Sequence, residues 1–293
     1  MPYIDRTYIK SVLPPRDPNG HKGTFGKVLC VGGSVGYTGA PIFASRAAVR
    51  TGSGLVFLGV PESIWQVAAV KSDEAMPFPM RDMDGKLHGC FDEIARRAEG
   101  CDAVLYGCGL GRSAGLDELI RQVLTIPRPL VLDADGINAL SGHINILDGR
   151  RAPTILTPHD GEFQRLTGCD LPILDRLAAA RNFAKAHRCT LVLKGHATVT
   201  AAPDGSVWIN ASGNPGMAKG GSGDVLAGLL AGLLGQKHLW GEHTVLSEMV
   251  AVGVYYHGQA GDRCAEAMGE YGMIPTDLIA ALPAVLKEHT RED

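Results

Sequence analysis

The 293-residue sequence lacks the marks of several protein classes. Its longest apolar run, residues 225–234, is about half of the ~20 residues that a membrane-spanning helix needs. The 28 Lys+Arg and 31 Asp+Glu residues leave a formal charge of −3, which provides no basic surface for nucleic acid. No basic segment leads into an apolar stretch at the N-terminus, so no secretory signal is expected. We therefore predict a cytoplasmic protein that binds neither membrane nor nucleic acid.

Signatures of disulfides, zinc sites and common nucleotide loops are also missing. The seven cysteines form no CxxC pair, and the ten histidines show no HxxxH or HExxH spacing. This pattern indicates reduced thiols and argues against a transition-metal enzyme. The glycines of residues 33–39 do not match G-x-G-x-x-G, and residues 23–28 lack the spacing and the Ser/Thr of a Walker loop. A Rossmann dinucleotide site and a P-loop are therefore not supported.

Short apolar segments do alternate with helical stretches along the chain. We predict buried strands at residues 27–31, 55–58, 102–106, 130–132, 154–156 and 190–193. Residues 197–201 and 206–209 flank Pro203-Asp204-Gly205 and predict an antiparallel hairpin. The pattern predicts an α/β protein with three layers, α/β/α, and a mostly parallel central sheet with a C-terminal antiparallel hairpin. We expect a single domain over residues 1–293, with residues 71–90 as a surface excursion.

Glycine is the residue in excess, with 38 in the chain, or roughly 13% against a usual ~7%. Many of these glycines follow predicted strands, where ligands bind in open parallel sheets. Glycine in such loops lets backbone N–H groups approach a phosphate closely. Loops after strands also need glycine for turns, so any single loop is ambiguous. Several such loops at one edge favour a nucleotide-sized site.

The strongest local motif is GNPGMAKGGSGD, residues 213–224, which runs into an apolar helix. Gly220, Gly221, Ser222 and Gly223 would present unpaired N–H groups as an anion hole at the helix N-terminus. Asp224 follows directly and is a candidate catalytic base for phosphoryl transfer, although Asp is also a common helix cap. We expect the helix N-terminus to lower the basicity of Asp224.

Seven motifs together resemble the ribokinase-like superfamily and, within it, the ADP-dependent NAD(P)H-hydrate dehydratases. They are KGTFGK (22–27) with GGS (32–34), YTGAP (37–41), GCGLG (107–111), DADG (133–136), TPHDGE (157–162), LKGHAT (193–198) and residues 213–224. The family usually has Gly-Pro-Gly in the second loop, so Cys108 is a departure, which we interpret as affecting loop stiffness and not chemistry. The family's epimerase is often fused at the N-terminus, and we expect it here on a separate chain.

The resemblance implies repair of damaged nicotinamide cofactor. ADP would phosphorylate the C6 hydroxyl of the S form of NADHX or NADPHX, and loss of phosphate would restore NADH or NADPH, with AMP and phosphate as products. It implies that Asp224 accepts the hydroxyl proton and that Ala40, Gly109, His159 and Asp224 bind the hydrate. It further implies nucleotide binding by Lys194, Gly195, His196, Ala197, Thr198 and Gly223. A homo-oligomer, such as a homotetramer, is also implied.

Each of these residues has a simpler interpretation. Ala40 could belong to a helix start, Gly109 to a turn, and His159 to a solvated loop. The carboxylates of Asp133, Asp135 and Glu162 could hold Mg²⁺ through water, with Glu162 as the metal candidate, although a helix N-cap is favoured for Asp135.

Two other functions remain open from sequence. An ATP-dependent vitamin or sugar kinase of the same superfamily would share the glycines and Asp224, whereas residues 157–162 and 194–198 favour the dehydratase. A nucleotide-sensing module without catalysis would tolerate loss of the Asp224 carboxylate.

Overall fold

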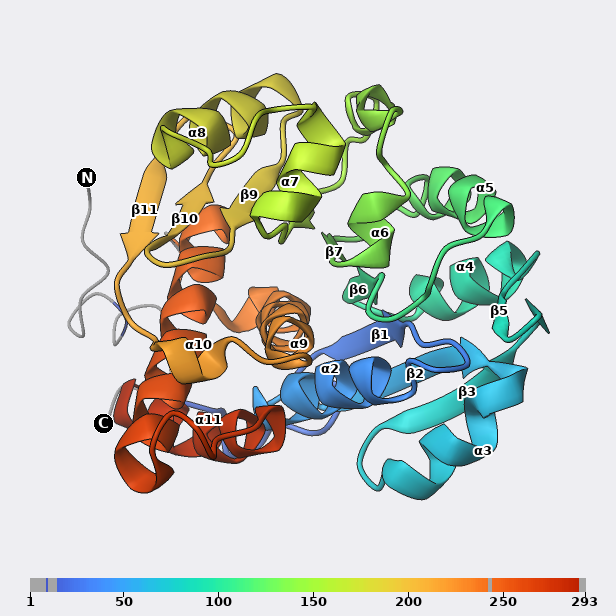
Figure 1. Ribbon diagram of the computed structural model, residues 1–293. Coiled ribbons are helices and arrows are strands. Elements are labelled where there is room, and N and C mark those ends of the chain that lie inside the picture. The colour runs from blue at the N-terminus through green and yellow to red at the C-terminus, as the bar shows by residue number, and fades with distance from the viewer. Residues whose placement is uncertain (1–8, 10–14, 242–243, 290–293) are drawn as a thin grey trace.

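The chain folds around one nine-stranded sheet (Figure 1). The computed structural model describes residues 9, 15–241 and 244–289. The strand order is β11-β10-β9-β8-β7-β6-β1-β2-β3. In chain order the strands are β1 (Lys27–Val31), β2 (Leu55–Pro61), β3 (Met76–Met80), β6 (Ala103–Tyr106), β7 (Leu130–Leu132), β8 (Thr154–Leu156), β9 (Thr190–Leu193), β10 (Thr198–Ala201) and β11 (Val207–Asn210). All neighbours from β3 to β9 pair in parallel, whereas β10 is antiparallel to both β9 and β11, which confirms the predicted hairpin.

Alternating side chains of the central strands enter two separate cores. In β1, Val28 and Cys30 belong to one core, and Leu29 and Val31 belong to the other. This alternation follows from the two-residue period of a strand. Because both faces are covered, most residues of these strands are apolar, as is typical of buried parallel sheets.

Helices cover both faces of the sheet and complete the predicted three layers. On the side of the first core lie α2 (Gly39–Arg50), α3 (Glu62–Lys71), α9 (Ser222–Gly235), α10 (Leu246–Met268) and α11 (Pro275–His289). On the side of the second core lie α4 (Phe91–Glu99), α5 (Ala114–Val123), α6 (Asp135–Asn138), α7 (Asp160–Thr167) and α8 (Arg176–Ala186). The short 3₁₀ helices are η1 (Ile144–Leu147), η2 (Pro215–Met217) and η3 (Lys237–Leu239). No helix in these described ranges is both long and apolar enough to cross a bilayer.

Part of the glycine excess serves packing and not the loops. An ideal Cβ on Gly228 of α9 would lie 2.0 Å from the carbonyl oxygen of Ala44 in α2. On Gly232, one turn later, it would lie 3.0 Å from the Ala48 oxygen. These glycines therefore let α9 cross α2 at close range.

The interpretation of residues 71–90 as a surface excursion is wrong in part. This stretch contains β3, which pairs with β2 at the edge of the main sheet, and the separate two-stranded sheet of β4 (Asp82–Met83) and β5 (Lys86–Leu87). Pro77 and Pro79 lie within β3, and proline is tolerated there because an edge strand needs hydrogen bonds on one side only. The strand was not predicted because two of its five residues are prolines, which rarely occur in strands.

Candidate active site

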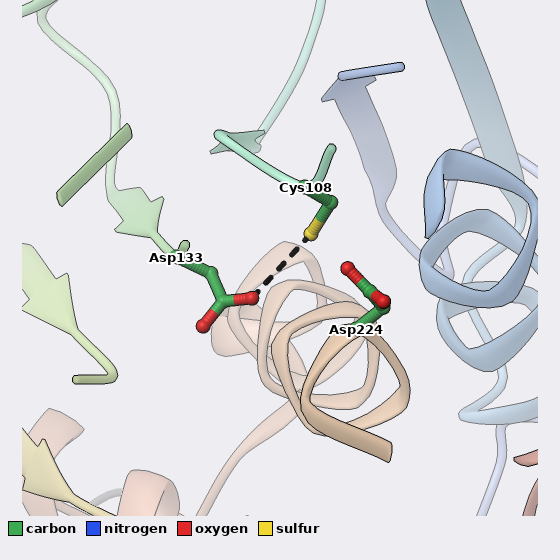
Figure 2. Close-up of side chains that lie close together, drawn as sticks. All are labelled: Cys108, Asp133 and Asp224. Carbon is green, nitrogen blue, oxygen red and sulfur yellow. Dashed lines mark hydrogen bonds between the residues drawn. The ribbon is translucent and has the colours of Figure 1, made fainter. Parts of the chain in front are cut away.

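Three side chains from separate parts of the chain meet where the strands end. Cys108 lies in the loop after β6, Asp133 follows β7, and Asp224 lies in the first turn of α9, as Figure 2 shows. One ligand atom from each residue lies within 4.8 Å of the others. This is the carboxyl edge of the parallel strands, the usual place for a ligand in an open α/β sheet.

The N-terminus of α9 is open on one side. The N-cap position is Gly221, with φ of 102°, so Asp224 occupies the third helical position and does not cap the helix. An ideal Cβ on Gly220 would meet no heavy atom of the described structure within 4 Å. A Cβ on Gly223 would lie 3.3 Å from Lys194 Nζ. The glycines thus leave room for an anion between the helix N-terminus and a lysine.

The electrostatic surroundings of Asp224 differ from the expectation. The pKa of Asp224 is raised to about 7, first by burial and then by the charge of Asp133. The neighbouring Cys108 thiol and the charge of Lys194 lower this pKa. The prediction of lowered basicity is therefore wrong, because burial beside a second carboxylate outweighs the helix N-terminus. A carboxylate with this pKa can accept a proton near neutral pH.

Lys194 is held by two buried carboxylates. Its Nζ lies 2.9 Å from Asp133 Oδ1 and 3.7 Å from Glu162 Oε2. Burial lowers the pKa of Lys194, but the charges of Asp133 and Glu162 outweigh burial and leave the pKa raised. Thr157 Oγ1 donates to Asp133 Oδ1 over 2.6 Å and fixes that carboxylate. The result is a permanent positive charge next to Gly223.

His159 has a structural role and is still open to a ligand. Its Nδ1 accepts hydrogen bonds from the N–H groups of Gly161 and Glu162, over 3.0 and 3.3 Å, and so caps α7. Its side chain remains 53% exposed. The loop interpretation of His159 is thus incomplete, because the ring is oriented by the helix that it caps.

Glu162 does not fit a direct Mg²⁺ ligand in this arrangement. Its Oε2 accepts from the backbone N–H of His159 over 2.9 Å, its Oε1 lies 3.5 Å from His159 Nε2, and Lys194 occupies the cation position beside it. Asp135 also differs from the prediction, because it is the first helical residue of α6 and not its N-cap. Its Oδ2 accepts from the N–H of Gly111 over 2.8 Å.

The predicted hydrate-binding residues Ala40 and Gly109 lie together. An ideal Cβ on Gly109, whose φ is +68°, would lie 2.9 Å from the Cβ of Ala40 near the start of α2. Ser34 Oγ donates to the carbonyl oxygen of Gly109 over 2.9 Å, and the N–H of Gly33 donates to that of Cys108 over 2.8 Å. The loops after β1 and β6 are therefore bonded to each other beside the α2 N-terminus.

The predicted nucleotide segment forms the exposed link between β9 and β10. Gly195, His196 and Ala197 are exposed, and Thr198 Oγ1 donates to the carbonyl oxygen of Gly195 over 3.0 Å. Sequence reasoning missed Arg176, whose Nη2 donates to the carbonyl oxygens of Leu193 and Lys194 over 2.9 and 3.0 Å. No motif contains this arginine. It lies at the start of α8 and contacts the link between β9 and β10 only in the folded chain.

A cavity of about 550 Å³ opens beside the same strand ends. Its lining includes Gly111, Arg112, Asp135, Asn138, His143 and Arg165. Arg165 Nε donates to Asn138 Oδ1 over 2.8 Å, which orients the guanidinium group on the cavity wall. The volume lies in the ~300–1,000 Å³ range that is typical of ligand sites.

A mostly parallel sheet with a glycine-rich helix N-terminus and an acidic residue in its first turn defines a protein of the ribokinase-like superfamily. A family model described as NAD(P)H-hydrate dehydratase matches residues 28–284. The chain belongs to this family.

Similar proteins agree in sequence and in structure. The chain is 40% identical over 294 residues to a bifunctional NAD(P)H-hydrate repair enzyme of Moorella thermoacetica, covering 99% of this chain and 54% of that protein. It is 36% identical over 264 residues to the ADP-dependent (S)-NAD(P)H-hydrate dehydratase of Neisseria meningitidis, covering 88% and 83% of the two chains. The crystal structure of the Bacillus subtilis ADP/ATP-dependent NAD(P)H-hydrate dehydratase, co-crystallised with ATP/Mg²⁺, aligns with a TM-score of 0.83 at 31% identity over 98% of both chains. The chain spans about half the length of the bifunctional relatives.

Proposed function

We propose that this protein is an ADP-dependent dehydratase of the S form of NADHX and NADPHX. The observation that carries the proposal is the position of Asp224, a partly buried carboxylate with a pKa of about 7 at a glycine-rich helix N-terminus. Lys194 lies directly beside that N-terminus. Such a site brings a proton acceptor and an anion-binding site together, as phosphoryl transfer to a hydroxyl requires.

The reaction would proceed in two stages. Asp224 accepts the proton of the C6 hydroxyl. The oxygen of this hydroxyl attacks the β-phosphorus of ADP, and the bond between that phosphorus and AMP breaks. The ring nitrogen then expels the phosphate from C6, and loss of a ring proton restores the dihydronicotinamide. Since phosphate is a better leaving group than hydroxide, the first stage makes the second one feasible. The N–H groups of residues 220–223 and the Lys194 ammonium would stabilise the phosphoryl oxygens.

The remaining predicted residues would bind the two substrates. The nucleotide would bind to residues 194–198, of which residues 195–197 are exposed. Ala40 and Gly109 lie together near the start of α2, and His159 follows β8. These three residues would contact the damaged nicotinamide ring. Mg²⁺ would arrive on the phosphate oxygens of the nucleotide and neutralise their charge there. Given the contacts of Glu162, we assign the ion no protein ligand and no step.

The cavity beside Gly111 would take the more distant half of the hydrate. It adjoins the loop that carries Gly109, and Arg112, His143 and Arg165 lie in its wall. Arginine binds phosphate through paired N–H groups. We infer that these residues contact the phosphates of the dinucleotide.

A direct assay tests the proposal. NADHX is incubated with the protein and ADP, and the recovery of NADH is followed by its absorbance, with AMP measured as coproduct. Recovery that requires ADP supports the proposal. Failure to recover NADH, together with ATP-dependent phosphorylation of a thiazole, pyrimidine or sugar alcohol, would establish the kinase instead. Nucleotide binding without either reaction would indicate a sensing module.

A further inference from the structure

His257 of α10 contacts the backbone at the start of α9. Its Nε2 lies 2.9 Å from the carbonyl oxygen of Ser222, the first residue of α9. A carbonyl oxygen only accepts hydrogen bonds, so Nε2 carries a proton and donates it. Burial lowers the pKa of His257 to about 4, and the ring is therefore neutral near neutral pH. The contact thus selects one tautomer of the ring, with its single proton on Nε2.

The packing of α10 against α9 brings His257 to this position. Gly253 lies one turn before His257 on the same face of α10. An ideal Cβ on Gly253 would lie 2.6 Å from Leu230 Cδ2 and 3.0 Å from Leu229 Cδ2, both in α9. The glycine therefore lets the two helices approach closely, and His257 is presented by a helix that is packed in place.

The same helix also holds the other end of the glycine-rich motif at residues 213–224. Asp262 Oδ2 accepts a hydrogen bond from the N–H of Gly213 over 2.9 Å, and its Oδ1 accepts one from Asn214 Nδ2 over 3.1 Å. Helix α10 thus binds the motif near both of its ends. His257 makes the contact at the end that precedes Asp224.

The hydrogen bond from His257 acts on the N–H group of Gly223. The Ser222 carbonyl and the Gly223 N–H belong to one planar peptide group, so a partner that orients the oxygen also orients the N–H. Glycine at position 223 leaves this peptide group little conformational restraint of its own. A hydrogen bond accepted by the carbonyl also polarises the peptide group and strengthens its N–H as a donor.

We propose that His257 is a positioning residue for the anion-binding N-terminus of α9, where it donates to the Ser222 carbonyl and thereby orients the Gly223 N–H toward the transferred phosphoryl group. This inference rests on the proposed function, in which the N–H groups of residues 220–223 stabilise the phosphoryl oxygens. The proton on Nε2 is held by the carbonyl, so His257 acts through Gly223 and not on the substrate. None of the motifs in the sequence contains this histidine.

The test compares His257→Gln with His257→Asn. The amide nitrogen of glutamine can take the place of Nε2 and donate to the same carbonyl, whereas the side chain of asparagine is too short to reach it. Both variants keep a neutral, polar amide at this position, so the hydrogen bond is the main difference between them. The values of kcat and KM are measured by recovery of NADH from NADHX and ADP.

We expect kcat of His257→Asn to fall about ten- to a hundredfold, somewhat less than the ~10²–10³-fold cost of removing such a donor completely. In His257→Gln, kcat is expected to stay within about threefold of the unchanged protein. KM for NADHX should be the same in both variants, because the N–H acts on the transferred phosphoryl group and not on the binding of the hydrate.

Nuclear magnetic resonance provides a measurement that does not depend on activity. With ¹³C-carbonyl serine and ¹⁵N-glycine, a carbonyl–nitrogen correlation spectrum contains only the four Ser-Gly pairs of the chain, at 53–54, 141–142, 212–213 and 222–223. The Ser222 carbonyl should resonate at lower ¹³C frequency in His257→Asn than in His257→Gln, because only glutamine preserves the hydrogen bond. The pairs at 53–54 and 141–142 should be the same in both variants.

His187 provides a matched control at the end of α8. Its side chain is 16% exposed, and its Nδ1 lies 2.9 Å from Asp148 Oδ1. His187→Asn therefore also removes a histidine contact, but at a distance from α9. It should lower Tm and leave kcat unchanged.

Two kinetic results would overturn the inference: an unchanged kcat in His257→Asn, or an equal loss of kcat in His257→Gln. Either would show that this hydrogen bond does not set the geometry of the anion-binding site. If the unchanged protein shows no ADP-dependent recovery of NADH, the proposed function itself fails. The spectrum still decides in that case, because equal Ser222 resonances in the two variants would show that His257 does not act on this peptide group.

Discussion

Asp224→Asn should reduce turnover and at the same time stabilise the fold in a pH-dependent way. The partly buried carboxyl group of Asp224 keeps its proton up to about pH 7 in the folded protein, whereas in the unfolded chain it ionises near its ordinary value of 3.8. Between these two values the unfolded state releases a proton that the folded state retains, so the stability of the unchanged protein falls as the pH rises. Asparagine does not titrate, and the variant lacks this loss.

The size of the effect follows from the shift in pKa. A rise from 3.8 to about 7 is a difference of about 3 pH units, and each unit corresponds to about 1.4 kcal/mol. The variant should therefore gain up to about 4 kcal/mol above pH 7, or roughly 8 °C in Tm for a chain of this length. Turnover should fall by a factor of about 10² to 10⁴, the usual contribution of a general base.

Thermal unfolding of both proteins at about pH 4 and about pH 8 measures the gain, and NADH recovery measures the turnover. The difference in Tm should be close to zero at the lower pH and largest at the higher pH. Asp170→Asn, at an exposed position, controls for the loss of one charge and should change neither quantity. The reasoning would be refuted if Asp224→Asn gained the same Tm at both pH values. It would also be refuted if the variant were less stable than the unchanged protein at the higher pH.

Three further changes probe other parts of the site and the fold. Lys194→Gln should raise KM for ADP about ten- to a hundredfold, since a hydrogen bond to a charged group contributes about 1.5–3 kcal/mol. It should also move the acidic limb of the pH profile of kcat/KM to higher pH, because Lys194 lowers the pKa of Asp224. Gly228→Ala should lower stability by about 1–3 kcal/mol, measured by urea unfolding, because its Cβ would lie 2.0 Å from the Ala44 oxygen. Arg165→Gln should raise KM for the hydrate about tenfold and leave KM for ADP unchanged, if the cavity binds the dinucleotide phosphates.

Each of these variants has a matched control. Lys71→Gln removes an exposed lysine on α3, and Arg121→Gln removes an exposed arginine on α5. Gly149→Ala adds a Cβ where no heavy atom of the described structure lies within 4 Å. If Lys71→Gln raised KM for ADP as much as Lys194→Gln, the effect would come from net charge and not from the site. Equal stability of the two alanine variants would mean that α2 and α9 can separate at little cost.

Much of the fold was predictable because its signals are local. The apolar runs of β1, β6, β7 and β9 need only the rule that parallel strands are buried on both faces. The turn residues Pro203-Asp204-Gly205 predicted the hairpin of β10 and β11. The strand β3 escaped notice because two prolines contradict strand propensity, and its edge position, which makes them tolerable, is not a local property.

The candidate site was only partly predictable. The motif at 213–224 indicated an anion-binding helix N-terminus with Asp224 beside it, and the other motifs indicated which loops would contribute. The pairing of Lys194 with Asp133 joins residues 61 positions apart, and Arg176, which contacts Lys194, belongs to no motif. Such contacts depend on which strands become neighbours and on how far each loop extends.

The sequence by itself thus determined the element types, the edge of the sheet that carries the site, and the residue that ends the glycine-rich motif. Only the tertiary structure decided how Asp224 behaves. A helix N-terminus alone would have made it a weaker base, whereas burial next to Asp133 makes it a stronger one. Burial and neighbouring charge are properties of the assembled fold, which no single sequence motif contains.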